Sequence, residues 1–95
     1  MQVNPSQLFK ILELNNSLTL AGVFAMFRDT RAKVGYEIKD DTDEQTTYKV
    51  FIDLRSYNNV GCLTIVHDKV KQTSVLRNKG LASHTLNWEA LKKEP

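Results

Sequence analysis

The sequence is poor in cysteine, in net charge and in long apolar runs, and each shortage excludes a class of protein. Among its 95 residues there is one cysteine, Cys62, which excludes an internal disulfide and a zinc site built from several cysteines. The formal net charge is +2, too small to indicate a polyanionic partner by itself. The longest apolar run, LTLAGVFAMF at 18–27, is about half a membrane span. The N-terminus lacks the pattern of a signal peptide, so we expect a soluble cytoplasmic protein without a membrane partner.

Motifs that would support catalysis are missing as well. The sequence has no glycine-rich phosphate loop, no nucleophile elbow and no histidine and carboxylate set spaced to bind a metal. Cys62 and His67 lie five positions apart on one expected strand, so their side chains point to opposite faces and form no dyad. Cys62 is more simply a small core residue, and His67 with Asp53 would be a structural cross-strand pair. The sequence therefore predicts no enzyme and no cofactor.

Length and composition indicate one folded domain that spans residues 1–95. The chain is 41% hydrophobic and 25% charged, as in soluble globular proteins, and its length suffices for one modest core. The clearest element is a helix at about 5–14, with Asn4 as N-cap and Pro5 in the first position. Its apolar residues recur at helical spacing, and the two asparagines that follow suit the end of a helix.

The next segment permits two interpretations. Ser17 or Thr19 can cap a second helix that runs to about Thr30 and is apolar on nearly every side, hence buried. The same apolar residues also suit a buried strand, because periodicity does not separate short apolar runs. Ala21 and Ala25 favour the helix, because alanine has the highest helix propensity. We expect a helix, with a strand as the alternative.

From residue 33 onward, apolar and polar residues alternate, which is typical of half-buried antiparallel strands. We expect strands at 33–39, 47–55, 60–67 and 69–77. The third is apolar on both faces and therefore belongs in the middle of the sheet. The side chains expected to face the core are Val34, Tyr36, Ile38, Tyr48, Val50, Ile52 and Leu54.

A loop and a closing helix are expected at the end of the sequence. The stretch RNKGLAS at 77–83 is typical of a loop, and SHTLNWEALKKE at 83–94 predicts a helix capped at Ser83 or Thr85. The residues expected to anchor this helix are Leu86, Trp88 and Leu91. The predicted fold class is α+β, with two N-terminal helices (the second could be a strand), an antiparallel sheet of three to four strands and a C-terminal helix.

An acidic cluster, DDTDE at 40–44, lies between two of the expected strands. Aspartate favours turns, so a hairpin loop accounts for the cluster without any further role. A calcium loop of the EF-hand type needs a glycine for its sharp turn and a glutamate further along, and both are missing. We therefore predict a solvated turn and no metal site.

Basic side chains are concentrated in the second half of the chain. Residues 33–45 hold two basic and five acidic side chains, whereas residues 46–82 hold six basic and two acidic ones. If the basic positions of the second and fourth strands share the outer sheet face, they form a basic patch around an aromatic side chain. Lysines on an edge strand also prevent aggregation, which is the simpler explanation. The candidate partner-binding residues are Lys49, Phe51, Arg55, Lys69, Lys71, Arg77 and Lys79.

Charges of both signs on one small domain suit a protein partner better than uniformly negative nucleic acid. We therefore expect a non-catalytic protein-binding module that acts as an inhibitor or regulator of a larger protein or complex. The alternative is a nucleic-acid-binding module that uses the basic outer face. Because exposed edge strands can pair, a homodimer formed by sheet extension is a further option.

Overall fold

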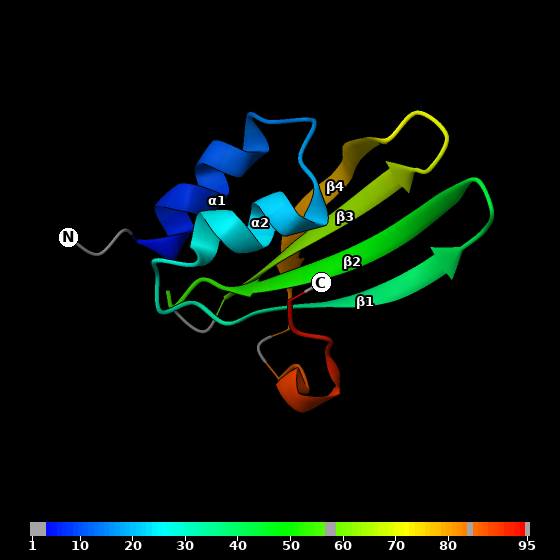
Figure 1. The fold of residues 1–95 in the computed structure, drawn as a ribbon. Helices are drawn as coiled ribbons and strands as arrows, with labels where there is room; N and C mark the ends of the chain where they lie inside the picture. Colours follow the sequence, from blue (N-terminus) through cyan, green and yellow to red (C-terminus); the bar gives the residue numbers. More distant parts are fainter. Residues whose placement is uncertain (1–3, 57–58, 84, 95) are drawn as a thin grey trace.

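Residues 4–56, 59–83 and 85–94 are described by the computed structural model of the protein, and within them two α-helices lie on one face of a four-stranded sheet (Figure 1). The helices are α1 (Pro5–Glu13) and α2 (Leu20–Phe27). The strands are β1 (Val34–Asp41), β2 (Gln45–Asp53), β3 (Val60–Asp68) and β4 (Thr73–Ala82). This arrangement confirms the α+β class.

Helix α1 begins as its sequence predicts. The Asn4 side chain accepts a hydrogen bond of 2.8 Å from the N–H of Ser6, and Pro5 occupies the first helical position. Phe9 and Leu12 are buried toward the sheet. The cap satisfies a backbone N–H that has no partner within the helix.

Residues 20–27 form a helix, which decides between the two interpretations of this segment. The Thr19 hydroxyl accepts a hydrogen bond of 3.0 Å from the N–H of Gly22 and caps α2. The buried residues Leu20, Val23, Phe24 and Phe27 recur at the spacing of one helix face. No helix within the described residues is long and apolar enough to cross a membrane.

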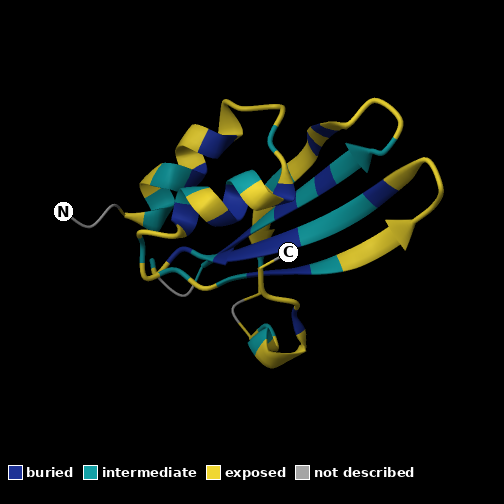
Figure 2. Ribbon diagram, in the orientation of Figure 1, coloured by how far each residue is buried: buried dark blue, intermediate teal, exposed yellow. Residues whose placement is uncertain are grey.

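The sheet is an antiparallel meander in the order β1-β2-β3-β4. Tyr36 lies opposite Val50, and Val50 lies opposite Leu63, so these side chains share the face that the helices cover. Most of the predicted core set belongs to this buried cluster or packs against it. Ile38 is the exception, with 41% of its surface exposed, because β1 extends beyond the helices toward its hairpin (Figure 2).

Strand β4 differs from its prediction at both ends. Residues 69–72 form a turn, in which the Asp68 carboxylate accepts hydrogen bonds from two backbone N–H groups. The predicted loop at 77–83 is wrong, because the strand continues to Ala82. Between Leu76 and Asn78 the register shifts by one residue, so Arg77 forms a bulge. A bulge reverses the faces of the residues that follow it.

The predicted C-terminal helix is also wrong. Within the described part of residues 83–94, the only helical turn is the 3-10 helix η1 (Trp88–Ala90). The segment instead crosses the sheet face opposite the helices, which we call the outer face (Figure 1). There, Leu91 joins Phe51 and Val60 in a second, smaller buried cluster. Contact with the outer face of the sheet therefore outweighs the helix propensity of these residues.

Both edges of the sheet are partly covered by other segments. On the edge of β1, Tyr36 exchanges two backbone hydrogen bonds of 2.9 Å with Lys92. On the edge of β4, the N–H of Leu76 donates to the carbonyl of Asn16 at 3.1 Å. A homodimer formed by sheet extension has only the remaining edge backbone to pair with, and it stays a prediction.

Candidate functional site

The seven predicted partner-binding residues do not gather on one surface. Lys49 and Phe51 lie on the outer face of β2, where the Lys49 ammonium lies 5.7 Å from the centre of the Phe51 ring. Phe51 is only 4% exposed, however, because residues of the C-terminal segment pack on it. It is therefore not available to stack on a base, as the nucleic-acid hypothesis requires.

Lys79 lies on the other face of the sheet. Its register position opposite Leu63 places it on the helix side, as a consequence of the bulge at Arg77. The ammonium donates hydrogen bonds to the carbonyls of Glu13 at 2.7 Å and of Leu12 at 3.3 Å. Cations near the C-terminus of a helix stabilise it, because the last carbonyls have no partner within the helix. Lys79 therefore holds α1 against β4.

Replacing Lys79 with methionine keeps most of the aliphatic stem and removes the ammonium. We expect the free energy of unfolding to fall by about 1 kcal/mol, the usual size of a favourable interaction at a helix end. Urea denaturation followed by circular dichroism measures this. Lys71→Met, in the exposed turn before β4, is the matched control and should change stability by less than about 0.5 kcal/mol. Equal effects of the two substitutions would contradict the capping role.

Lys69 links the tip of the β1–β2 hairpin to the tip of the β3–β4 hairpin. Its ammonium donates a hydrogen bond of 2.8 Å to the Asp41 carboxylate and one of 2.7 Å to the carbonyl of Thr42. The hydrogen bonds from Lys69 and from Thr46 lower the pKa of Asp41 below its ordinary value. Asp41, the last residue of β1 and a member of the predicted acidic cluster, therefore forms an ion pair within the chain, and Lys69 is already engaged.

The remaining basic residues are far apart along the sheet. Arg55 follows the end of β2, where its guanidinium donates a hydrogen bond of 2.9 Å to the carbonyl of Arg31 and lies 3.6 Å from Asp53. Lys71 lies in the β3–β4 turn and Arg77 in the bulge of β4, both exposed. The expected single basic face is therefore wrong, whereas the role of each basic side chain in binding stays a prediction.

The candidate polar pairs also change once the register is known. Asp53 pairs with Val60, whereas His67 pairs with Thr46 toward the other end of the sheet, so the expected pair of His67 and Asp53 is wrong. The Nδ1 of His67 instead lies 3.0 Å from the hydroxyl of Ser74. Within the described ranges, no three histidine, cysteine, aspartate or glutamate side chains are placed to hold a metal ion.

Cys62 lies on the outer face and not in the main core. It pairs with Phe51 in the register and packs, half-buried, against the outer cluster. Burial raises the pKa of its thiol, which reduces the thiolate fraction at neutral pH. Cys62 was predicted as a small core residue, but it is half-buried beside the second cluster, on the face opposite His67.

The outer face is divided into a covered and an uncovered half. Residues 86–91 pack over Phe51 and Val60, at the end of the sheet where α1 begins on the other side. Beyond them, two cross-strand rows of β2, β3 and β4 face outward without this cover. We call this surface the open half; its side chains are Thr47, Lys49, Thr64, Val66, Val75 and Asn78.

The open half combines β-branched side chains with charges of both signs. Val75 is 42% exposed, and Val66 and the two threonines are half-buried. Glu37 of β1 lies beside Lys49 in the register and pairs with Lys39 at 3.3 Å. Sequence reasoning missed this surface, because it took Val75 as an interruption in the basic row and Val66 as part of a strand that is apolar on both faces. The register of β4 after its turn was the missing information.

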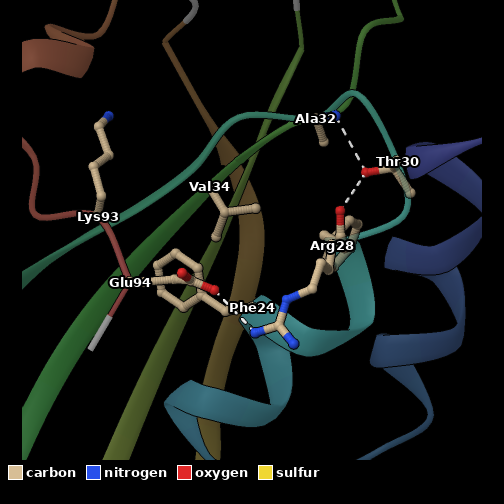
Figure 3. A pocket seen from close by; sticks show the side chains of 8 residues that line it. Phe24, Arg28, Thr30, Ala32, Val34, Lys93 and Glu94 are labelled. Carbon is tan, nitrogen blue, oxygen red and sulfur yellow. Dashed lines mark hydrogen bonds and ion pairs between the residues drawn. The ribbon is translucent and has the colours of Figure 1, made fainter.

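A shallow pocket of about 250 Å³ lies between α2, the start of β1 and the C-terminal segment (Figure 3). Phe24 and Val34 form its apolar wall, and the ion pair of Arg28 and Glu94, at 2.9 Å, lies on its rim. Its volume is below the roughly 300 Å³ at which ligand pockets usually begin. The pocket therefore marks where the C-terminal segment meets α2.

Comparison with known proteins was made at the level of families, of curated sequences and of solved structures. No family model matches this chain, and neither a curated protein nor a solved structure matches it.

Proposed function

We propose that this chain is a small non-catalytic protein-binding module that uses the outer face of its sheet. The observation that carries the proposal is that the two faces of the sheet differ in what covers them. Both helices cover one face and complete the core, while the open half presents Val66 and Val75 to solvent. Exposed apolar groups rimmed by polar ones are typical of surfaces that bind proteins.

Charge supports a protein over a nucleic acid. Lys49 of the open half lies beside Glu37, so the potential there alternates in sign. A nucleic-acid strand needs a continuous basic track and exposed aromatic rings, whereas Phe51 is buried and Lys79 is bound to α1. A protein partner with complementary charges suits this surface better. We further propose that the module acts in the cytoplasm as an inhibitor or regulator of a larger protein or complex.

Val75→Glu tests the proposal, because it places a carboxylate in the open half at a position that is already partly exposed. We expect the variant to remain folded and to recover at least about tenfold less partner, since a charge buried in an interface is costly. The measurement is affinity purification of the tagged chain from its native host, with and without nuclease.

Leu14→Glu is the matched control, because Leu14 is 87% exposed just after α1, on the side of the sheet away from the open half. It should recover the partner as well as the unmodified chain does. If both variants recover the partner equally, the open half is not the binding surface. If recovery is lost on nuclease treatment, the nucleic-acid alternative is supported instead.

A further inference from the structure

The C-terminal segment, residues 85–94, lies on the outer face like a docked peptide. It leaves the end of β4, makes the single turn η1 and then crosses to the edge of β1 (Figure 1). Within it, Leu91 is buried, and Leu86 and Trp88 are partly buried against the same cluster. Most of its other described residues are exposed. The segment thus contributes a few apolar side chains to a sheet whose core lies on the other face.

Gly35 has no side chain and leaves a space on the outer face that Leu91 fills. We call this space the Leu91 seat. A methyl group at Gly35 would lie 2.9 Å from the Cβ of Leu91, closer than real Cβ atoms approach other atoms. Leu91 therefore occupies the space that any larger residue would fill. Phe51 and Val60 form the apolar floor beside this seat and are only 4% and 3% exposed. Large apolar residues on an outer sheet face require a cover, which the segment supplies.

Backbone hydrogen bonds fix the direction of the segment. The N–H of Lys92 donates to the carbonyl of Tyr36, and the N–H of Tyr36 donates to the carbonyl of Lys92, both at 2.9 Å. This antiparallel bridge adds one residue pair to the edge of β1. Glu94 then forms an ion pair with Arg28, the residue that follows α2, on the helix side (Figure 3). The segment therefore passes around the edge of β1 from one face to the other.

These attachments are few. The bridge is a single pair, and the ion pair joins two side chains that are each more than half exposed, so it contributes little. Segments with few buried contacts open at a lower free energy than the core strands do. Opening residues 85–94 would uncover the Leu91 seat, the apolar floor and the backbone of Tyr36 together.

We propose that this seat, its floor and the adjacent edge of β1 form a peptide-binding groove, which the chain's own C-terminal segment occupies when no partner is present. The occupant from the partner is a protein segment with apolar side chains spaced like Leu86, Trp88 and Leu91, and its backbone is extended where it pairs with Tyr36. It adds antiparallel to β1 and displaces residues 85–94. The inference rests on the proposed function and adds a mechanism of autoinhibition, because the chain competes with its partner for one site.

The chemistry of this occupant follows from the segment already seated there. Leu91 occupies the space that a Cβ at Gly35 would need, so the anchor of the partner is an aliphatic side chain of similar size. The bridge at Tyr36 requires an extended backbone at the next residue, which is the pattern of strand addition to a sheet edge. Pockets for alternate side chains then provide the specificity.

The test uses the full-length chain and a fluorescent synthetic peptide of residues 85–95, TLNWEALKKEP. We expect the variant Leu91→Ser to bind this peptide at least about tenfold tighter than the unmodified chain, whose groove is free less than about a tenth of the time. A peptide that itself carries Leu91→Ser should bind neither protein. Circular dichroism checks the fold, and Leu86→Ser weakens the segment from its other end as a second variant.

Cys62 provides a second readout, because it packs against the cluster that the segment covers. Its labelling by a thiol reagent should be faster in Leu91→Ser than in the unmodified chain, and the peptide should slow it again. Hydrogen exchange tests the opening of the segment in the unmodified chain. The Lys92 amide should exchange faster than the Val50 amide of the central strand β2. Equal protection of these two amides would show that the segment does not open, and the proposal fails.

Two further results would contradict the proposed peptide-binding groove. One is equal peptide affinity of the unmodified chain and folded Leu91→Ser, and the other is no binding to either. If sedimentation shows a dimer that Leu91→Ser converts to monomers, the occupant is the segment of a second copy and not a partner. The two proposals can also fail separately. If Val75→Glu loses the partner in affinity purification but no variant binds the peptide, the proposed function stands and only the groove is disproved.

Discussion

Replacing Phe27 with alanine should lower the free energy of unfolding by about 3–5 kcal/mol, the usual cost of removing a fully buried phenylalanine. Phe27 is 2% exposed, at the C-terminal end of α2, and belongs to the main cluster together with Val50 and Ile52 of the sheet. The substitution removes apolar contacts and leaves a cavity, since the helix and sheet relax only partly. Because domains of this size have only about 5–14 kcal/mol of stability in total, the effect would be a large part of it.

Equilibrium urea denaturation followed by circular dichroism measures this loss. Arg28→Ala, at the adjacent position, is the control, because the Arg28 side chain is 64% exposed and its ion pair with Glu94 is worth little. It should change stability by less than about 0.5 kcal/mol. A loss of under 1 kcal/mol in Phe27→Ala would contradict the packing of α2 against the sheet.

Gly61→Ala should destabilise the chain by about 1–3 kcal/mol, the usual cost of overpacking a core. Gly61 faces the helices from β3, and a methyl group there would lie 2.6 Å from the Cε2 atom of the Phe9 ring. Phe9 is 5% exposed and has little room to retreat. The ring therefore moves away from the sheet or α1 shifts, and either response costs packing contacts.

Gly80→Ala is the matched control for this clash. A methyl group at Gly80 meets nothing within 4 Å, and neither glycine has a positive φ angle. The control should be neutral or stabilising by up to about 1 kcal/mol, because alanine restricts the unfolded chain. Adding Phe9→Leu should restore part of the stability lost in Gly61→Ala. If the two glycine substitutions act alike in thermal and urea denaturation, Phe9 does not pack on Gly61.

The elements that local patterns determine were predicted well. Asn4 and Thr19 cap their helices through the short-range hydrogen bonds expected of such residues. Alternation in β1 and β2 predicted most of the side chains that face the helices, because the apolar residues of these strands recur at every second position on that face. In these places local preference and tertiary packing agree.

The missed elements are those where a long-range contact overrides the local pattern. The bulge at Arg77 reverses the faces of β4, so alternation counted from Lys69 assigned Lys79 to the wrong side. Residues 83–94 hold good helix formers, but a short helix is marginal alone, and Leu91 gains more by packing beside Gly35. Neither the bulge nor the partner of Leu91 can be read from neighbouring residues.

The candidate site was the least predictable part for the same reason. Which half of the outer face is open depends on where residues 85–94 return to the sheet, through contacts between residues far apart in the sequence, such as Leu91 with Phe51 and Lys92 with Tyr36. The basic residues can be listed from the sequence alone. Their partners, such as the α1 carbonyls for Lys79 and Asp41 for Lys69, appear only in the folded chain.

The meander order of the sheet has a consequence for how the chain folds. Each strand pairs with the next one along the sequence, so the sheet grows by short loop closures, which favour fast folding. The two helices precede the sheet, although their apolar faces pack on it. During synthesis, α1 and α2 therefore leave the ribosome with those faces uncovered. Lys79 reaches the end of α1 only after β4 has been made, so the first helix of the chain is among the last elements to be secured.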